Sequence, residues 1–166
     1  MAEAEEKPIL FVDVDGVISL FGFESIDDPP GRFHWIDGIA HCIKLEAGPL
    51  LRELEELFEM VWATGWEEKA NEYLPGILEL ESKWPTLGFD GQAVFGSAHW
   101  KLGQIDQYAG DRPAAWIDDN LDDECIEWAK ERRAPTMLVL TETADGITSE
   151  HVEQLLDFAH ELEQEY

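Results

Sequence analysis

The chain has 166 residues, of which 45% are hydrophobic and seven are tryptophan. This length and composition predict a single folded domain over residues 1–166 with a substantial hydrophobic core, and they exclude a disordered chain. The formal net charge of −26 argues against a nucleic-acid partner bound along its phosphates, so any phosphate-bearing ligand needs local positive charge from a metal or a placed lysine or arginine.

Targeting and redox features point to the cytoplasm. The acidic segment 1–8 lacks the basic region and apolar stretch of a signal peptide. No apolar run approaches the roughly 20 residues that span a bilayer. Cys42 and Cys125 lie far apart and have no CxxC partner, which disfavours a zinc site or a redox pair and favours ordinary thiols in a reducing compartment. We therefore expect a cytoplasmic protein without a membrane segment.

A buried strand near the start of the chain leads into two acidic residues. Residues 9–12 are four consecutive apolar side chains, typical of a parallel-sheet strand with both faces covered. Asp13, Asp15 and Gly16 follow, where open α/β sheets bind their ligands. Strand alternation directs both acids to one side, and Gly16 allows a sharp turn. Neighbouring carboxylates repel unless a cation or shared proton relieves them, and Mg²⁺ is the simplest such cation.

The segment 19–48 is predicted to be a small insertion. Pro29-Pro30-Gly31 breaks any regular element. The β-prone runs 33–36 and 39–45 are separated by Asp37-Gly38, a strong hairpin signal. We therefore expect a small β-hairpin flap within 19–48, too short to be a cap domain with its own core.

Helices and strands alternate along the rest of the chain. The apolar spacing and the breaks predict helices over 49–59, 67–74, 101–108, 122–132 and 150–163. Apolar runs predict strands over 60–63, 114–117 and 136–140, with a weaker one over 93–95. This alternation is typical of an α/β fold: a three-layer, Rossmann-like parallel sheet covered on both faces, with the flap but no full cap domain.

Three local details of these helices are also predicted. Thr148 or Ser149 is expected to cap the last helix. Pro75-Gly76 is expected to end the helix that begins at residue 67, with one more turn after it. Ile126 and Ala129 are expected to face inward from the helix over 122–132.

Polar residues stand where three of the predicted strands end. Because the ends of parallel strands meet at one edge of a sheet, these side chains are expected to converge there. Acids suit Mg²⁺, and a hydroxyl, backbone N–H groups and an ammonium suit phosphate oxygens. An arrangement of this kind supports phosphoryl transfer. The strand-end residues are Asp13 and Asp15, Thr64 with Gly65, and Asp118 with Asp119. Lys101 begins the helix that leads into the third of these strands and is expected to join them.

At these residues the chain resembles the haloacid dehalogenase-like (HAD) phosphohydrolases, and among them small capless bacterial members. The run Phe11-Val12-Asp13-Val14-Asp15-Gly16-Val17 looks like the first motif of that superfamily. Ala63-Thr64-Gly65 resembles the second motif, Lys101 the third, and Ile117-Asp118-Asp119 the fourth, in the same order along the chain. Lys101 is matched by position alone, and Lys83 is a possible substitute.

The resemblance implies a Mg²⁺-dependent phosphatase, a hydrolase acting on phosphoric ester bonds. Asp13 would be the nucleophile that forms an aspartyl-phosphate, and Asp15 the general acid and then the base. The metal would be held by Asp13, by Asp15 through its backbone carbonyl, by Asp118, and by Asp119 directly or through water. Thr64, Gly65 and Lys101 would bind the phosphate. A capless member leaves its site open, so the expected substrate is a small or exposed phosphoester.

Alternatives from other classes remain open at this point. One is a receiver-like signalling module that binds Mg²⁺ and phosphate, although in receivers the phosphorylated acid follows the third strand and precedes the threonine, unlike here. Another is a non-catalytic domain that keeps the pocket as a relic. A phosphatase that processes nucleic-acid ends is a sub-case of the enzyme, disfavoured by the charge. The sequence does not predict the substrate or the oligomeric state. Trp66 and Trp100 adjoin motif residues, and core packing is favoured for both over lining the pocket.

Overall fold

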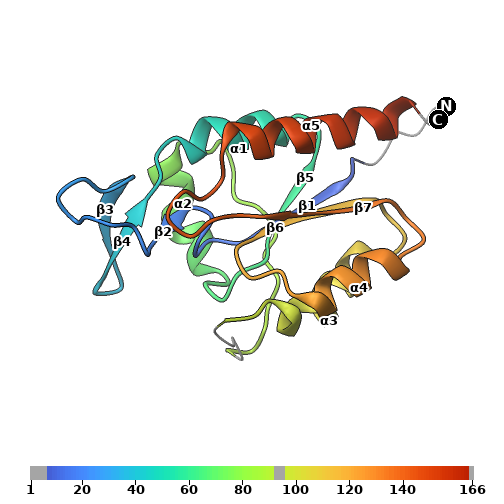
Figure 1. Cartoon of the computed structure of the whole chain (residues 1–166), viewed down its shortest axis with the longest axis horizontal. Coiled ribbons are helices and arrows are strands. Elements are labelled where there is room, and N and C mark those ends of the chain that lie inside the picture. The colour runs from blue at the N-terminus through green and yellow to red at the C-terminus, as the bar shows by residue number, and fades with distance from the viewer. Residues whose placement is uncertain (1–6, 92–95, 165–166) are drawn as a thin grey trace.

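In the computed structural model, which describes residues 7–91 and 96–164, the chain forms an α/β fold around a four-stranded parallel sheet. The strands lie in the order β5-β1-β6-β7, so the first strand is central (Figure 1). Their bounds are Ile9–Val12 for β1, Glu59–Trp62 for β5, Ala114–Asp118 for β6 and Thr136–Leu140 for β7. These match the four main predicted strands.

Helices cover both faces of the sheet, which makes the three layers expected from the sequence (Figure 1). On one face, α1, α2 and α5 pack against Leu10, Trp62 and their neighbours. On the other, α3 and α4 pack against Phe11, Trp116 and their neighbours. The bounds are Ala47–Glu55 for α1, Lys69–Leu78 for α2, Leu102–Ala109 for α3, Asp123–Glu131 for α4 and Ser149–Gln164 for α5, with a 3₁₀ turn, η1, at His99–Lys101.

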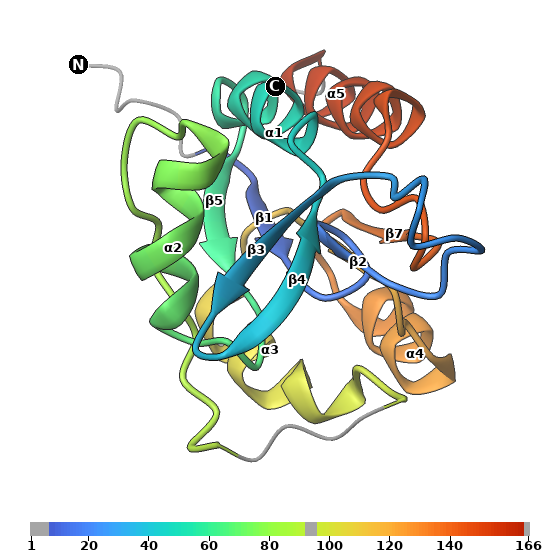
Figure 2. The same cartoon turned by 90° about the vertical axis from the view of Figure 1, so that its left-hand side faces the viewer.

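The predicted hairpin flap is present and stands over the carboxyl edge of the sheet (Figure 2). Strands β3, Arg32–Ile36, and β4, Ile39–Ile43, pair antiparallel, and β2, Ser19–Leu20, adds a third strand beside β4. Asp37 and Gly38 join β3 to β4 with φ of 51° and 79°. Positive φ at both positions is what a two-residue hairpin turn needs, and it explains the Asp-Gly pair.

Several helix predictions need correction. The first helix covers 47–55 rather than 49–59, so Pro49 is its third residue and Phe58 lies in the turn before β5. Pro75 lies inside α2 and does not end it. The helix continues because Leu74 and Leu78, one turn apart, both bury their side chains in the core. It ends at Glu79, which is left-handed with φ of 57° and donates its N–H to the Pro75 carbonyl.

The prediction for the buried face of α4 is wrong at Ile126, whereas Ala129 is partly buried as expected. Ile126 is 41% exposed, whereas Cys125 is fully buried. The start of the helix sets this register, because Asp122 caps it by accepting a hydrogen bond from the Cys125 N–H at 3.2 Å. At the start of α5 the hydroxyl of Thr148 accepts from the His151 N–H at 3.4 Å, so Thr148 is the capping residue of the two proposed.

The segment between α2 and η1 extends the sheet by one bridge, in which Thr86 pairs parallel with Trp62 at the end of β5. The predicted strand over 93–95 lies outside the described residues. Among the helices that the structure describes, none combines the length and the apolar character that a bilayer crossing requires.

Candidate functional site

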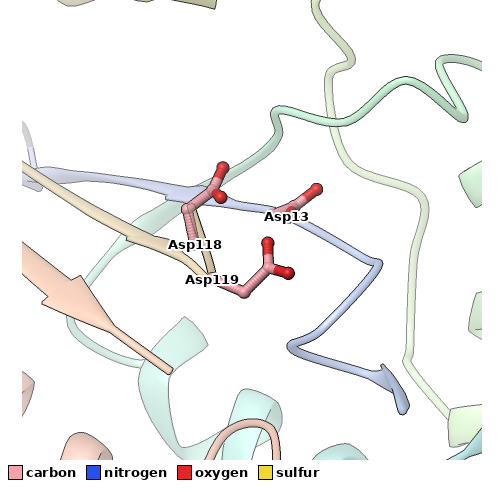
Figure 3. Close-up of side chains that lie close together, drawn as sticks. All are labelled: Asp13, Asp118 and Asp119. Carbon is pink, nitrogen blue, oxygen red and sulfur yellow. The ribbon is translucent and has the colours of Figure 1, made fainter. Parts of the chain in front are cut away.

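Three carboxylates converge where β1 and β6 end. Asp13 directly follows β1, and Asp118 is the last residue of β6, which pairs with β1 so that Val12 lies opposite Ile117. The Asp13 N–H continues the pairing by donating to the Ile117 carbonyl at 3.1 Å. One oxygen from each of Asp13, Asp118 and Asp119 lies within 4.8 Å of the other two (Figure 3). The parallel register therefore brings acids about a hundred residues apart into one cluster.

Lys101 is the cation of this cluster. Its Nζ lies 2.6 Å from Asp118 Oδ2 and 3.1 Å from Asp13 Oδ1. All three side chains are at least nine-tenths buried. The turn η1, which precedes α3, carries Lys101 to the strand ends. Lys83, the alternative left open by the sequence, is exposed, so the structure favours Lys101.

Gly16 lets the chain turn tightly around the cluster. It has φ of 80°, and a Cβ added there would lie 2.3 Å from Asp119 Oδ2. Its carbonyl accepts a hydrogen bond from the buried Thr141 hydroxyl at 2.8 Å. Thr141 follows β7 and was not singled out from the sequence, where a lone threonine after a strand carries no signal. The Thr141 hydrogen bond therefore connects the loop after β1 to the end of the edge strand β7.

The electrostatics of the cluster show an excess of negative charge. Burial raises the pKa of Asp13 well above its ordinary value, and Asp118 and Asp119 add to this, while the Lys101 ammonium opposes it. Burial and the neighbouring Asp118 raise the pKa of Asp119 to about 6. Burial alone would lower the pKa of Lys101, but Asp13 and Asp118 raise it instead. The single Lys101 ammonium therefore does not balance the negative charge of the three carboxylates.

This donor set suits a divalent cation. Carboxylate oxygens are the ligands that Mg²⁺ prefers, and the ion would supply the charge that one lysine leaves unbalanced. Asp13, Asp118 and Asp119 bring their side chains together as predicted for metal ligands. The side chain of Asp15 is not in this cluster, which leaves only its backbone carbonyl for the metal role that the resemblance implies.

Asp15 turns instead toward the flap. Its Oδ1 accepts a hydrogen bond from Trp66 Nε1 at 3.2 Å, and it lines a cavity of about 390 Å³. Its side chain is solvent-accessible, but its concave surroundings remove part of its water. This loss of hydration raises the pKa of Asp15, although the Trp66 hydrogen bond and the nearby His41 oppose the rise. A carboxyl group that holds its proton more tightly is suited to proton donation.

Trp66 has two roles in the structure. It is partly buried and packs against the core, as expected, but it also holds Asp15. Its ring lies against His41, with centroids 4.8 Å apart, and His41 Nδ1 is 2.9 Å from the Ser19 hydroxyl. Trp66 and His41 thus connect the flap to the acid. The sequence placed Trp66 beside a motif but had no signal for this contact.

Thr64 and Gly65 lie on the other side of Asp13. They follow β5, the neighbour of β1 opposite to β6. The Ala63 N–H donates to the Val12 carbonyl at 2.9 Å, which keeps this loop aligned with the end of β1. Thr64 is buried and its hydroxyl accepts from the Trp66 N–H at 3.2 Å, whereas Gly65 is exposed. The predicted residues thus occupy one edge of the sheet.

Comparison with known proteins adds no assignment. No protein-family model matches this chain, and a search of curated proteins finds no match.

Proposed function

We propose that this chain is a Mg²⁺-dependent phosphomonoester hydrolase of the HAD-like superfamily that acts through an aspartyl-phosphate on Asp13. The observation that carries the proposal is the buried contact of Lys101 with both Asp13 and Asp118, beside Asp119. A buried lysine between two acids is costly to maintain for stability alone. The same arrangement provides a carboxylate nucleophile, a cation site and an ammonium for the phosphate in one place.

In the first step, a carboxylate oxygen of Asp13 attacks phosphorus, and the bond from phosphorus to the leaving oxygen breaks. Asp15 donates its proton to that oxygen as it leaves. In the second step, water attacks the phosphorus of the aspartyl-phosphate, Asp15 accepts the proton of the water, and the Asp13 carboxylate is released with inorganic phosphate. Asp15 loses its proton in the first step and regains one in the second, so the two steps together return both acids to their starting protonation states.

The remaining residues bind the phosphate and the metal. The Thr64 hydroxyl, the Gly65 N–H and the Lys101 ammonium would contact phosphate oxygens. Asp13, Asp118 and the Asp15 carbonyl would hold Mg²⁺, with Asp119 ligating directly or through water. When bound, the ion neutralises the charge that builds on the phosphate oxygens.

The substrate we propose is a small or exposed phosphoester. The insertion over the site is a three-stranded flap without helices of its own, so the described chain supplies no domain that would enclose a substrate. The charge of −26 disfavours a nucleic-acid polymer. Both cysteines, Cys42 and Cys125, are free and buried, in keeping with a cytoplasmic location.

The test is phosphate release from a panel of phosphomonoesters in the presence of Mg²⁺. We expect turnover by the native protein, loss by at least 10³-fold in Asp13→Asn, and no change in Asp27→Asn, a control at an exposed acid on the flap side. Absence of turnover across the panel would refute the proposal. A phosphoryl group that stays on Asp13 for minutes would instead favour a receiver-like module.

A further inference from the structure

The cavity beside Asp15 has mainly apolar and aromatic walls. It measures about 390 Å³ and lies at the flap, with Phe21, Phe23, Phe33 and Ala40 among its lining residues. The rings of Phe23 and Phe33 are in contact, with centroids 6.4 Å apart. Phe21 and Phe33 are nevertheless 48% and 39% exposed. Part of the surface of these rings is therefore not covered by packing within the chain, and it is available to contact a ligand in the cavity.

The charges around the cavity disfavour a ligand that carries a second negative charge besides the phosphate. Its polar side consists of Asp15, Ser19 and His41, and the Ser19 hydroxyl is 2.9 Å from His41 Nδ1. Among the described residues that line it there is no lysine or arginine. A second phosphate or a carboxylate on the ligand would therefore meet Asp15 with no lysine or arginine to compensate it.

We propose that this cavity holds the leaving group of the phosphoester and selects an uncharged aromatic ring, so that the substrates are aryl phosphates. The inference rests on the proposed function, because Asp15 can donate a proton to the leaving oxygen only if that oxygen reaches it. Asp15 itself lines the cavity. When the leaving oxygen lies at Asp15, the group attached to that oxygen lies in the cavity.

Size and surface chemistry agree with a ring. Cavities of about 300–1,000 Å³ hold small organic ligands, and this one is near the lower end. Rings pack well against phenylalanine side chains in edge-to-face or offset arrangements. A small aryl phosphate and a phosphotyrosine side chain both carry an aromatic ring on the leaving oxygen. The experiment below distinguishes these two kinds of substrate.

The first measurement is binding to the native protein with Mg²⁺, by calorimetry, of phenylphosphonate and ethylphosphonate, which are not hydrolysed. We expect phenylphosphonate to bind at least tenfold more tightly, because the ring is removed from water. Phe33→Ala removes a wall of the cavity and Ala40→Phe fills it. Both should reduce the ratio of the two affinities to less than threefold and leave ethylphosphonate binding unchanged, which also shows that the variants are folded.

The matched control is Ile39→Ala. Ile39 is a large apolar residue on the same hairpin, 61% exposed and not among the residues lining the cavity. We expect it to keep the native ratio. Equal affinities for the two phosphonates in the native protein, or an unchanged ratio in both cavity variants, would overturn the inference.

The second measurement is hydrolysis of phenyl phosphate, ethyl phosphate and capped phosphotyrosine. We expect the cavity variants to lower kcat/KM at least fivefold for phenyl phosphate and not for ethyl phosphate. If the cavity variants lower kcat/KM for capped phosphotyrosine as much as for phenyl phosphate, phosphotyrosine in a peptide is also a substrate. If the native protein does not hydrolyse capped phosphotyrosine, the substrates are restricted to small aryl phosphates. Turnover that ignores the cavity variants overturns this inference alone. Absence of both phosphonate binding and turnover overturns the proposed function and this inference with it.

Discussion

Replacing Asp119 by asparagine should stabilise the metal-free protein, although Asp119 belongs to the site. Burial and Asp118 raise the pKa of Asp119 to about 6 from its ordinary value of 3.8. The folded protein therefore holds this proton more tightly than the unfolded chain. Its contribution to stability is greatest at low pH and falls as the pH rises from 3.8 through 6. Above that range the carboxylate costs the fold free energy, which asparagine avoids.

The magnitude follows from the two pKa values. The difference between about 6 and 3.8, at about 1.36 kcal/mol per pH unit, gives an upper limit of about 3 kcal/mol. Asp119 is partly exposed, so water screens it and we expect about 1–2 kcal/mol. For a chain of this size that corresponds to a rise in Tm of roughly 3–6 °C. At pH 5 roughly half of the cost should be absent.

The assay is thermal unfolding in EDTA at pH 8 and at pH 5. Asp119→Asn should raise Tm at pH 8 and raise it less at pH 5, while Asp27→Asn, at an exposed position, should leave it unchanged at both. With Mg²⁺ at pH 8 the native protein should gain more than the variant, because a bound cation stabilises the folded state. A variant with a lower Tm than the native protein in EDTA at pH 8 would refute the reasoning.

Three further predictions concern the same edge of the sheet. Gly16→Ala should lower the free energy of unfolding by about 1–3 kcal/mol and remove most of the activity, because the added Cβ would meet Asp119 at 2.3 Å and φ is 80°. A variant that unfolds in urea with the same free energy as the native protein would contradict this. Lys101→Met should destabilise the metal-free protein by about 3–5 kcal/mol, since buried carboxylates lose their ammonium, and a change below about 1 kcal/mol by the same method would count against it. Trp66→Phe removes a hydrogen bond that lowers the pKa of Asp15, so the descending limb of the pH–rate profile should move to higher pH, and an unmoved limb would exclude Trp66 as its partner.

The sheet and the acid cluster were predictable because local signals and topology agree there. Four apolar residues before Asp13, and another apolar run before Asp118, identify β1 and β6 as buried strands. Parallel pairing then requires their ends to meet. The hairpin was predictable for a similar reason, since Asp37-Gly38 fits the positive φ that its turn requires.

What the sequence did not reveal depends on contacts between distant segments. Trp66 reaches Asp15 across 51 positions, and Thr141 reaches Gly16 across 125. Pro75 stays inside α2, against the prediction, because burial of Leu74 and Leu78 outweighs the local breaking tendency of proline. The choice between Lys101 and Lys83 likewise needed the packing of η1. Hydrophobicity and local propensity contain none of this information.

The central claim is that carboxylates from two neighbouring strand ends share one divalent ion, and calorimetric titration with Mg²⁺ tests it most directly. We predict one ion per chain for the native protein and for Asp27→Asn, and loss of binding in both Asp13→Asn and Asp118→Asn, each variant first shown to be folded by circular dichroism. A native protein that binds no Mg²⁺, or an affinity unchanged in either site variant, would contradict the claim.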